Sequence, residues 1–460
     1  MSKQSNVNRR DFLSGAAIMG ISGALGTGAI LSSCSSGNSS DQYTPLRPAN
    51  EVYIPELPDK AMDGKPLKAA LIGCGSRGTG AAFNFLDAGS GLSIIACADI
   101  FKDRMDACRK KLKEERNNEI ADDMCFTGFD AYKKACEAPV DVVLIATPSL
   151  FHPYHLRYAI EQGKHVFVEK PAAIDPAGFR TFMVAVKQAR SRGLNIVTGT
   201  ERHHNRSYVA SYQKIQEGYI GRIVSGNLYW NQGPMDYVRR RPEWTDMEYM
   251  LRDFFSWSWL CGDHVIDQLI HNVDVFTWFS HLRPEKVISM GSRIRRKNGN
   301  IYDNFNADIE YEGGVHVHAM ARQIDGCGRK VEEIIQGTKG VWKSKDMSIY
   351  DLDGNLVWQY DDNASKAKFK TQSDYVLEHI NLVNHIRSEK VIDIAETTAV
   401  SSMACIMARE SAYTGKEYTW EQMVTSDLDL MPKELHLGNV DMKQYESIPL
   451  PGLPAQEKQS

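Results

Sequence analysis

Short apolar runs and longer amphipathic segments alternate along the chain between residues 67 and 199. The apolar runs have the length of buried strands and lie at residues 67–72, 92–98, 140–146, 165–169 and 195–199. The segments between them show the three-to-four-residue periodicity of helices, at residues 78–88, 103–115, 150–162 and 179–192. This alternation predicts an α/β fold, a doubly wound parallel sheet with helices on both faces.

The pattern changes after about residue 200. Longer runs that alternate apolar with polar residues predict strands at 223–230, 286–295, 306–311 and 315–322. Glu312-Gly313-Gly314 predicts a hairpin turn between the last two, and helices are predicted at 263–279, 374–388 and 396–413. We therefore expect a first domain at 67–199, a second α+β domain with a mostly antiparallel open sheet at 200–435, and a C-terminal tail at 436–460.

The first 66 residues lack this periodicity. Asn8-Arg9-Arg10-Asp11-Phe12-Leu13 precedes a glycine-rich apolar stretch at 16–31, which is shorter than the ~20 residues of a bilayer crossing. This predicts a twin-arginine signal peptide at 1–33 and export to the periplasm. Leu31-Ser32-Ser33-Cys34 resembles a lipobox and predicts lipidation of Cys34, the alternative being an ordinary cleavage site. Residues 34–66 are rich in Ser and Pro and predict a flexible tether and arm.

A glycine loop follows the first predicted strand, with the spacing GxGxxG. The first glycine permits a tight turn, the second lets the backbone approach a pyrophosphate, and the third allows close helix–strand packing. An acidic residue 21 positions beyond the third glycine can accept hydrogen bonds from ribose hydroxyls and repels a 2′-phosphate. The loop therefore predicts a Rossmann domain that binds NAD rather than NADP. The residues expected to hold the cofactor here are Gly73, Gly75, Ser76, Arg77, Gly78 and Asp99.

Glu169-Lys170-Pro171 follows the predicted strand at 165–169. Ligands bind at this carboxyl edge in open α/β sheets, and a lysine there can stabilise a substrate oxygen during a redox step. The alternative is a solvated lysine beside a turn.

A second candidate for chemistry lies on the predicted helix at 263–279. Asp263, Asp267, His271 and Asp274 share one helix face. The alternative is the wet stripe of an amphipathic helix, but such stripes are normally rich in Lys and Glu. A His one turn after an Asp makes an acid–base pair, so we expect Asp267 to orient His271.

With Ala146-Thr147-Pro148, these motifs resemble the glucose-fructose oxidoreductase/inositol dehydrogenase (Gfo/Idh/MocA) family from about residue 67 onward. The resemblance implies that Lys170, Asp267 and His271 are the catalytic trio. It implies that the cofactor is lined by Thr147, Pro148, His152, Glu169 and Lys170. It implies substrate contacts from Arg202, His203, Trp230 and Asn231. Family relatives assemble through the open sheet face and generally need no metal, so we expect a homo-oligomer, a dimer or tetramer, and no metal site.

The formal net charge is −4 and no basic block interrupts the chain, which argues against a nucleic-acid partner. The expected partner is a small carbohydrate, with a membrane contacted only through the anchor or tether. No soluble nicotinamide pool exists outside the cytoplasm, so an exported enzyme would hold its NAD tightly.

We expect an NAD-dependent oxidoreductase that acts on a hydroxyl of a sugar, glycoside or cyclitol. The alternatives are a redox-neutral NAD-dependent glycosidase (oxidation, elimination, reduction) and a non-catalytic sugar- or cofactor-binding protein.

Overall fold

The computed structural model describes residues 44–452, apart from 236 and 393. The predicted signal peptide at 1–33 and the predicted lipidation site Cys34 lie outside the described residues.

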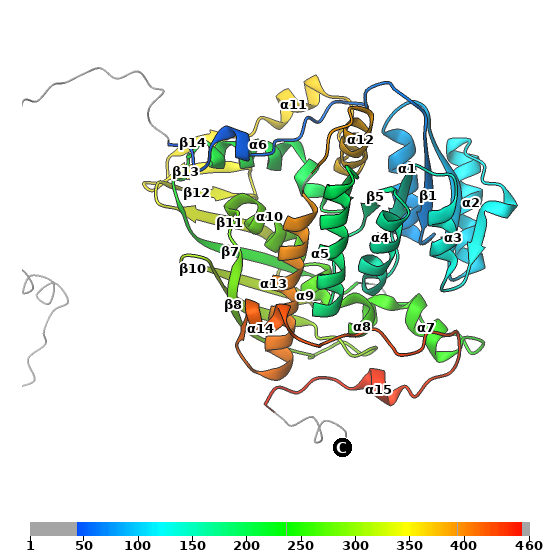
Figure 1. Cartoon of the computed structure of the whole chain (residues 1–460). Helices are drawn as coiled ribbons and strands as arrows, with labels where there is room; N and C mark the ends of the chain where they lie inside the picture. Colours follow the sequence, from blue (N-terminus) through cyan, green and yellow to red (C-terminus); the bar gives the residue numbers. More distant parts are fainter. Residues whose placement is uncertain (1–43, 236, 393, 453–460) are drawn as a thin grey trace, which may run out of the picture. The chain divides into compact units, whose positions relative to one another are not determined.

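Six parallel strands form the first sheet, in the order β3-β2-β1-β4-β5-β6 (Figure 1). Their bounds are Leu67–Ile72 (β1), Leu92–Asp99 (β2), Cys125–Thr127 (β3), Val142–Ile145 (β4), His165–Val168 (β5) and Ile196–Thr198 (β6). The predicted doubly wound parallel sheet is confirmed. The sequence pattern missed β3, because this three-residue edge strand is only half-buried and has no apolar run.

Helices cover both faces of this sheet. Those on one face are α3 (Ala131–Glu137), α4 (His152–Glu161) and α5 (Pro176–Ser191), and those on the other are α1 (Ser76–Asp87), α2 (Lys102–Arg116) and α12 (Asp374–Arg387). The last of these comes from far beyond the expected domain boundary at 199. Its side chains Leu377, Ile380 and Val383 are buried in one core with Leu71 and Phe167 of the first sheet. The first domain therefore takes part of its cover from a late segment of the chain.

Nine strands form the second sheet, in the order β14-β13-β12-β11-β7-β10-β9-β8-β15. They are mostly antiparallel, as predicted, with one parallel pair, β7 and β10. The hairpin between β9 and β10 turns at Glu312-Gly313-Gly314, where both glycines have positive φ, 79° and 71°. The bounds are Ile223–Gln232 (β7), Pro284–Ser292 (β8), Asn304–Tyr311 (β9), Val315–Gln323 (β10), Lys330–Gly337 (β11), Gly340–Lys343 (β12), Ser348–Asp351 (β13), Leu356–Gln359 (β14) and Tyr418–Thr419 (β15).

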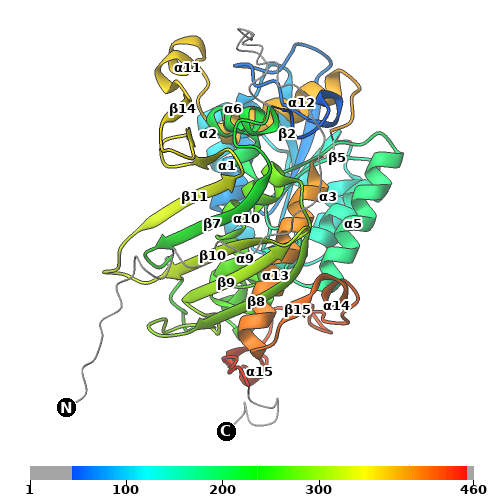
Figure 2. The same ribbon diagram turned by 90° about the vertical axis from the view of Figure 1, so that its left-hand side faces the viewer.

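The inner face of the second sheet packs against α10 (Ile270–Ser280) and α13 (Ala395–Thr414). In Figure 2 the outer face points toward the viewer, and none of the described helices lies in front of it. The remaining helices are α6 (Arg206–Gln216), α7 (Asp246–Arg252), α8 (Ser258–Cys261), α9 (His264–Asp267), α11 (Asp362–Lys368), α14 (Trp420–Val424) and α15 (Lys443–Glu446).

The prediction of one continuous helix at 263–279 is wrong, because the structure divides this segment into α9 and α10. In an unbroken helix the carbonyl oxygen of Asp267 would accept from the N–H of His271. Here that oxygen accepts from Lys170 Nζ at 2.5 Å, and the His271 N–H donates to Gln268 instead. The break between α9 and α10 therefore lies where Lys170 binds the Asp267 carbonyl oxygen.

Residues 44–66 lie along this chain's own surface, where the sequence predicts a flexible tether and arm. The Leu46 N–H donates to the carbonyl of Gln216 on α6. The Asp59 carboxylate accepts from the N–H groups of Lys370 and Thr371, each at 2.8 Å. These bonds fix the described part of the arm to the end of α6 and to the segment that precedes α12.

Candidate active site

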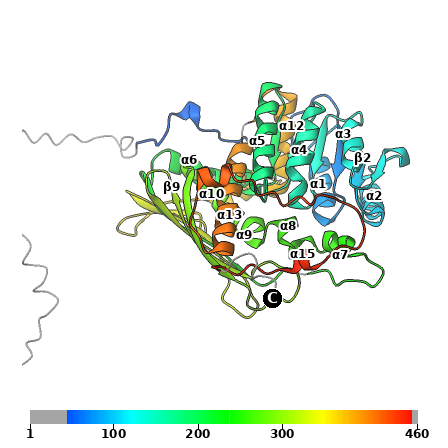
Figure 3. The ribbon, with the colours of Figure 1, turned by 60° about the horizontal axis from the view of Figure 1, so that its bottom comes forward.

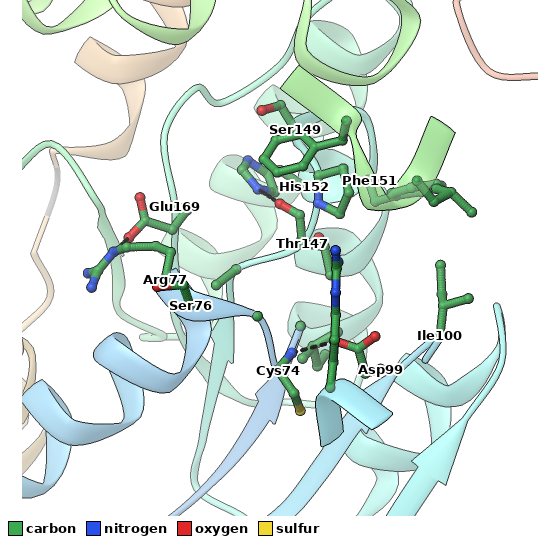
Figure 4. A pocket seen from close by; sticks show the side chains of 18 of the residues that line it. Cys74, Ser76, Arg77, Asp99, Ile100, Thr147, Ser149, Phe151, His152 and Glu169 are labelled. Carbon is green, nitrogen blue, oxygen red and sulfur yellow. Dashed lines mark hydrogen bonds and ion pairs between the residues drawn. The ribbon is translucent and has the colours of Figure 1, made fainter. Parts of the chain in front are cut away.

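One cavity of about 1560 Å³ brings together loops of the first sheet and elements of the second half of the chain (Figure 4). Its wall contains most of the residues singled out by sequence, including Gly73, Gly75, Ser76, Arg77, Asp99, Thr147, Pro148, His152, Glu169, Lys170, Trp230, Asp267 and His271. The motifs that lie far apart in the sequence therefore share one site.

The glycine loop fits a pyrophosphate at the N-terminus of α1. A Cβ on Gly73 would lie 2.5 Å from the Ala146 carbonyl oxygen, and one on Gly78 would lie 1.7 Å from the Gly73 carbonyl oxygen. Both glycines are therefore required by close backbone packing. A Cβ on Gly75 would meet no protein atom within 4 Å, although Gly75 lines the cavity. Only the absence of a side chain at Gly75 keeps this part of the wall open for a ligand to approach the backbone.

Asp99 lies at the end of β2 and ties the glycine loop to the start of α2. One carboxylate oxygen accepts from the Cys74 N–H at 2.6 Å, and the other from the Phe101 N–H at 2.8 Å. Burial raises the pKa of Asp99, against the lowering effect of these two bonds. Each oxygen keeps a further lone pair, so the carboxylate can still accept from ribose hydroxyls.

Lys170 and Asp267 meet across the two halves of the chain. Lys170 Nζ donates to the Asp267 carbonyl oxygen and lies 3.5 Å from Asp267 Oδ1. The other carboxylate oxygen of Asp267 accepts from the Gln268 side-chain amide at 2.5 Å. The lysine is thus a largely buried cation held by groups of the protein, not a solvated surface residue.

The carboxylate beside His271 is Glu201, which corrects the expectation that Asp267 orients this ring. His271 Nδ1 lies 3.2 Å from Glu201 Oε2, and both side chains are largely buried. Burial alone would raise the pKa of Glu201, but His271 and then Arg202 outweigh it and lower the pKa to about 2. The Trp230 ring stacks on His271, with the ring centroids 5.1 Å apart. No local sequence pattern indicates this pairing, because Glu201 lies 70 positions before His271 and the two side chains meet only in the folded chain.

Arg77 of the glycine loop faces Glu169 (Figure 4). Arg77 Nε donates to Glu169 Oε1 at 2.5 Å, and a second guanidinium nitrogen lies 3.4 Å from the buried carboxylate of Glu378 on α12. A Cβ at position 199 would lie 2.6 Å from Glu169 Oε2, so Gly199 makes room for this carboxylate. Glu169 therefore fixes the lysine motif to the glycine loop.

His152 joins two of the predicted cofactor motifs. Its two ring nitrogens each lie 2.8 Å from a backbone carbonyl oxygen, those of Pro171 and Thr147. Burial lowers the pKa of His152, against the raising effect of these contacts. The side chain supports the cavity wall with both nitrogens already engaged.

Arg202, His203 and Asn231 lie behind the cavity wall, and the structure does not support their sequence-based assignment to the substrate. Arg202 forms a buried ion pair with Glu333. His203 Nε2 lies 2.6 Å from the buried carboxylate of Asp274. The Asn231 amide donates to the sulfur of Met320 at 3.5 Å. Of the four predicted substrate residues, Trp230 is the one that lines the cavity.

Two family models match two consecutive regions of the chain. The Gfo/Idh/MocA model described as an oxidoreductase family with an NAD-binding Rossmann fold matches residues 67–196, and the family's C-terminal domain model matches residues 208–343. The chain belongs to the Gfo/Idh/MocA family. Its first domain is accordingly an NAD-binding Rossmann domain, as the glycine loop predicts.

Two curated relatives of this chain carry different names. A glycosyl hydrolase family 109 protein of Bacteroides fragilis is 28% identical over 234 residues, which cover 46% of this chain and 48% of the relative. The chain thus spans about half the length of this relative. The scyllo-inositol 2-dehydrogenase (NAD⁺) of Bacillus subtilis is 22% identical over 60% of this chain and 72% of its own.

Solved structures show the same fold. The scyllo-inositol dehydrogenase of Lactobacillus casei with bound NAD(H) and scyllo-inositol superposes with a TM-score of 0.58 at 22% identity. The match covers 77% of this chain and 99% of that one.

The described residues lack two features. Within residues 44–452, leaving aside 236 and 393, no helix combines the length and apolarity of a membrane span. In the same part of the chain, no three His, Cys, Asp or Glu side chains are grouped as metal ligands.

Proposed function

We propose that this protein is an NAD-dependent oxidoreductase that acts on a hydroxyl of a sugar, glycoside or cyclitol and keeps its cofactor tightly bound. The observation that carries the proposal is the convergence of the glycine loop, Lys170 and the His271–Glu201 pair on one cavity. When bound, NAD would accept two electrons and one hydrogen nucleus from the substrate carbon.

The side chains divide the remaining work. Lys170 would donate a hydrogen bond to the substrate oxygen and stabilise its developing charge. His271 would accept the hydroxyl proton. Glu201 would act as a positioning residue: it engages Nδ1 of His271 and supports the charged ring, which leaves the other ring nitrogen for the hydroxyl. Asp267 would hold Lys170 in place rather than orient the histidine.

A redox-neutral glycosidase is the second candidate. The similarity to the glycosyl hydrolase family 109 protein favours it, as does the presence of two further carboxylates, Glu169 and Glu201, on the cavity wall. Elimination next to an oxidised carbon requires a second proton to be moved, and a carboxylate near the site suits that step.

We propose export by the twin-arginine route with a lipid anchor on Cys34, on the basis of the N-terminal sequence motifs. We also propose assembly into a dimer or tetramer through the outer face of the second sheet. Ile288 and Met290 of β8 are 52% and 72% exposed there, which is unusual for large apolar side chains of a sheet.

The test uses the purified protein with the cofactor that it carries on isolation, mixed with free sugars, cyclitols and glycosides. Absorbance of the reduced nicotinamide and released products are followed together. A keto product with bound reduced cofactor supports the dehydrogenase. Product release without net reduction supports the glycosidase. Bound NAD without turnover on the whole panel contradicts both.

Lys170→Met and His271→Ala are the matching variants. Each is expected to lower the rate roughly 10²- to 10⁴-fold, the usual contribution of a positioned acid–base group. Lys110→Met is the control, since Lys110 is an exposed lysine of α2 that forms an ion pair with its helix neighbour Glu114 and does not line the cavity. Full activity of both active-site variants would overturn the assignment.

A further inference from the structure

A segment of the second half of the chain lies over the nucleotide end of the cavity. Val238, Leu251, Arg252 and residues 253–255 line the same cavity as the glycine loop, Asp99 and Phe101. Figure 3 shows α7 with α8 and α15 below the helices of the first domain. The adenosine side of the groove is thus bounded by an element outside the Rossmann domain.

Arg252, at the end of α7, joins this element to the first domain through both its side chain and its backbone. The Arg252 guanidinium binds both oxygens of Asp103 on α2, at 3.0 and 3.1 Å. Its carbon centre lies 3.9 Å from the centroid of the Phe101 ring, and Arg104 donates to its backbone carbonyl at 3.2 Å. A bidentate pair with an aromatic stack holds an arginine in one orientation better than a simple ion pair does.

The Arg252–Asp103 contact lies close to Asp99, the residue expected to bind the ribose. Phe101 and Asp103 lie two and four positions after Asp99, and the Phe101 N–H donates to the Asp99 carboxylate. The far side of α7 is held by the C-terminal tail: the Met247 N–H donates to the Gly438 carbonyl, and the Val440 N–H donates to Asp246. Movement of α7 away from the groove therefore requires the Arg252–Asp103 contact to open.

We propose that α7 and the following residues 253–255 form a cover over the adenosine half of the NAD site, latched by Arg252 on Asp103, which slows the release of bound cofactor. This inference rests on the proposed function, because it supplies the structural cause of tight cofactor binding. The Rossmann groove supplies the contacts with NAD, and the cover sets how fast NAD leaves.

The test measures exchange rather than catalysis. Purified protein with its bound nucleotide is mixed with excess isotope-labelled NAD, and the label retained after rapid gel filtration is followed over time. Arg252→Ala and Asp103→Asn are each expected to speed exchange at least about 10-fold, as expected for removing a charge-assisted bidentate contact. Asp103→Asn changes a largely exposed side chain and serves if Arg252→Ala does not fold.

Asp87→Asn is the matched control, because Asp87 forms a bidentate pair with Arg116 at the other end of α2 and neither residue lines the cavity. The substitution leaves Arg116 in place over the ring of Phe83, which does line it. This variant should exchange at the wild-type rate. The latch is refuted if both latch variants exchange at the control rate, or if wild type exchanges its NAD within the mixing time. Slow wild-type exchange without turnover of any carbohydrate would leave the latch standing and remove the proposed function.

Discussion

The two ends of the cavity are built in different ways. The nucleotide end is made of backbone from one contiguous stretch, the loop at 73–78, with Asp99 a short distance along the chain. The hydroxyl end is made of side chains that meet from remote elements: Lys170 after β5, Glu201 after β6, and His271 at the start of α10. The geometry of a contiguous motif can be predicted from the spacing of its residues. Side chains from remote elements can be paired only once the folded chain is known.

The largest effect is expected at the nucleotide end, where alanine substitutions at two glycines of the same loop should have different consequences for stability and for NAD binding. Gly78→Ala places a Cβ 1.7 Å from a backbone oxygen, so it should displace the loop, lower the melting temperature and abolish bound nucleotide. Gly75→Ala meets no protein atom, so it should keep the wild-type melting temperature and lose at least about 10-fold in NAD affinity, or ~1.4 kcal/mol. Thermal melts and titration with NAD measure both. Equal melting temperatures for the two variants would remove the distinction.

The next effect tests whether Arg202 serves the fold or the substrate. Because Arg202 is buried against the fully buried carboxylate of Glu333, Arg202→Met leaves an unpaired buried charge and should cost about 3–5 kcal/mol of unfolding free energy. Urea unfolding measures this cost, and bound nucleotide should stay at the wild-type level. The double variant Arg202→Met/Glu333→Gln is expected to recover part of the loss. Wild-type stability with weakened carbohydrate binding would restore the original substrate assignment.

A smaller effect separates the two carboxylates near His271. Glu201→Gln should lower turnover by roughly 100-fold, since the amide cannot support a charged imidazole ring, while bound NAD is unchanged. Glu201→Asp should recover part of the rate. Asp267→Asn should act instead through its side-chain contact with Lys170, whose Nζ lies 3.5 Å from Asp267 Oδ1, while the backbone carbonyl that Lys170 also binds is kept. The acid side of the pH–rate profile should therefore stay where it is in wild type. If Glu201→Gln turns over at the wild-type rate, the ring is oriented by another group.

The smallest effect is the pH dependence of stability. Because the pKa of Glu201 falls from 4.5 to about 2 in the folded protein, its ionised form stabilises the fold above about pH 4.5. That contribution should disappear as the pH falls toward 2. The difference in urea midpoint between wild type and Glu201→Gln should therefore shrink between pH 5 and pH 2.5 (about the range set by these pKa values). A difference that stays constant over this range would contradict the pairing with His271.

The same contrast explains what the sequence predicts well. Five of the six strands of the first sheet, strands β7 to β10 of the second, the hairpin at Glu312-Gly313-Gly314 and the NAD loop follow from local periodicity and spacing. Strands β3 and β11 to β15 do not, because most are short and none stands out as an apolar or alternating run. The division of α9 from α10 does not, because a lysine nearly a hundred residues earlier takes the carbonyl of Asp267. The family resemblance implies substrate contacts from Arg202 and His203, but burial against Glu333 and Asp274 gives them other partners. A matching position in the chain does not by itself distinguish a pocket residue from a core ion pair.

Because α12 lies near the end of the chain but covers the first sheet, it affects when the cofactor site can form. A growing chain that has reached residue 199 has all six strands of the first sheet but leaves bare the apolar surface that Leu377, Ile380 and Val383 later occupy. A stable nucleotide groove must therefore await synthesis of residues up to 387. We therefore expect NAD to bind only a chain that includes α12, and a first domain made on its own to aggregate rather than bind it.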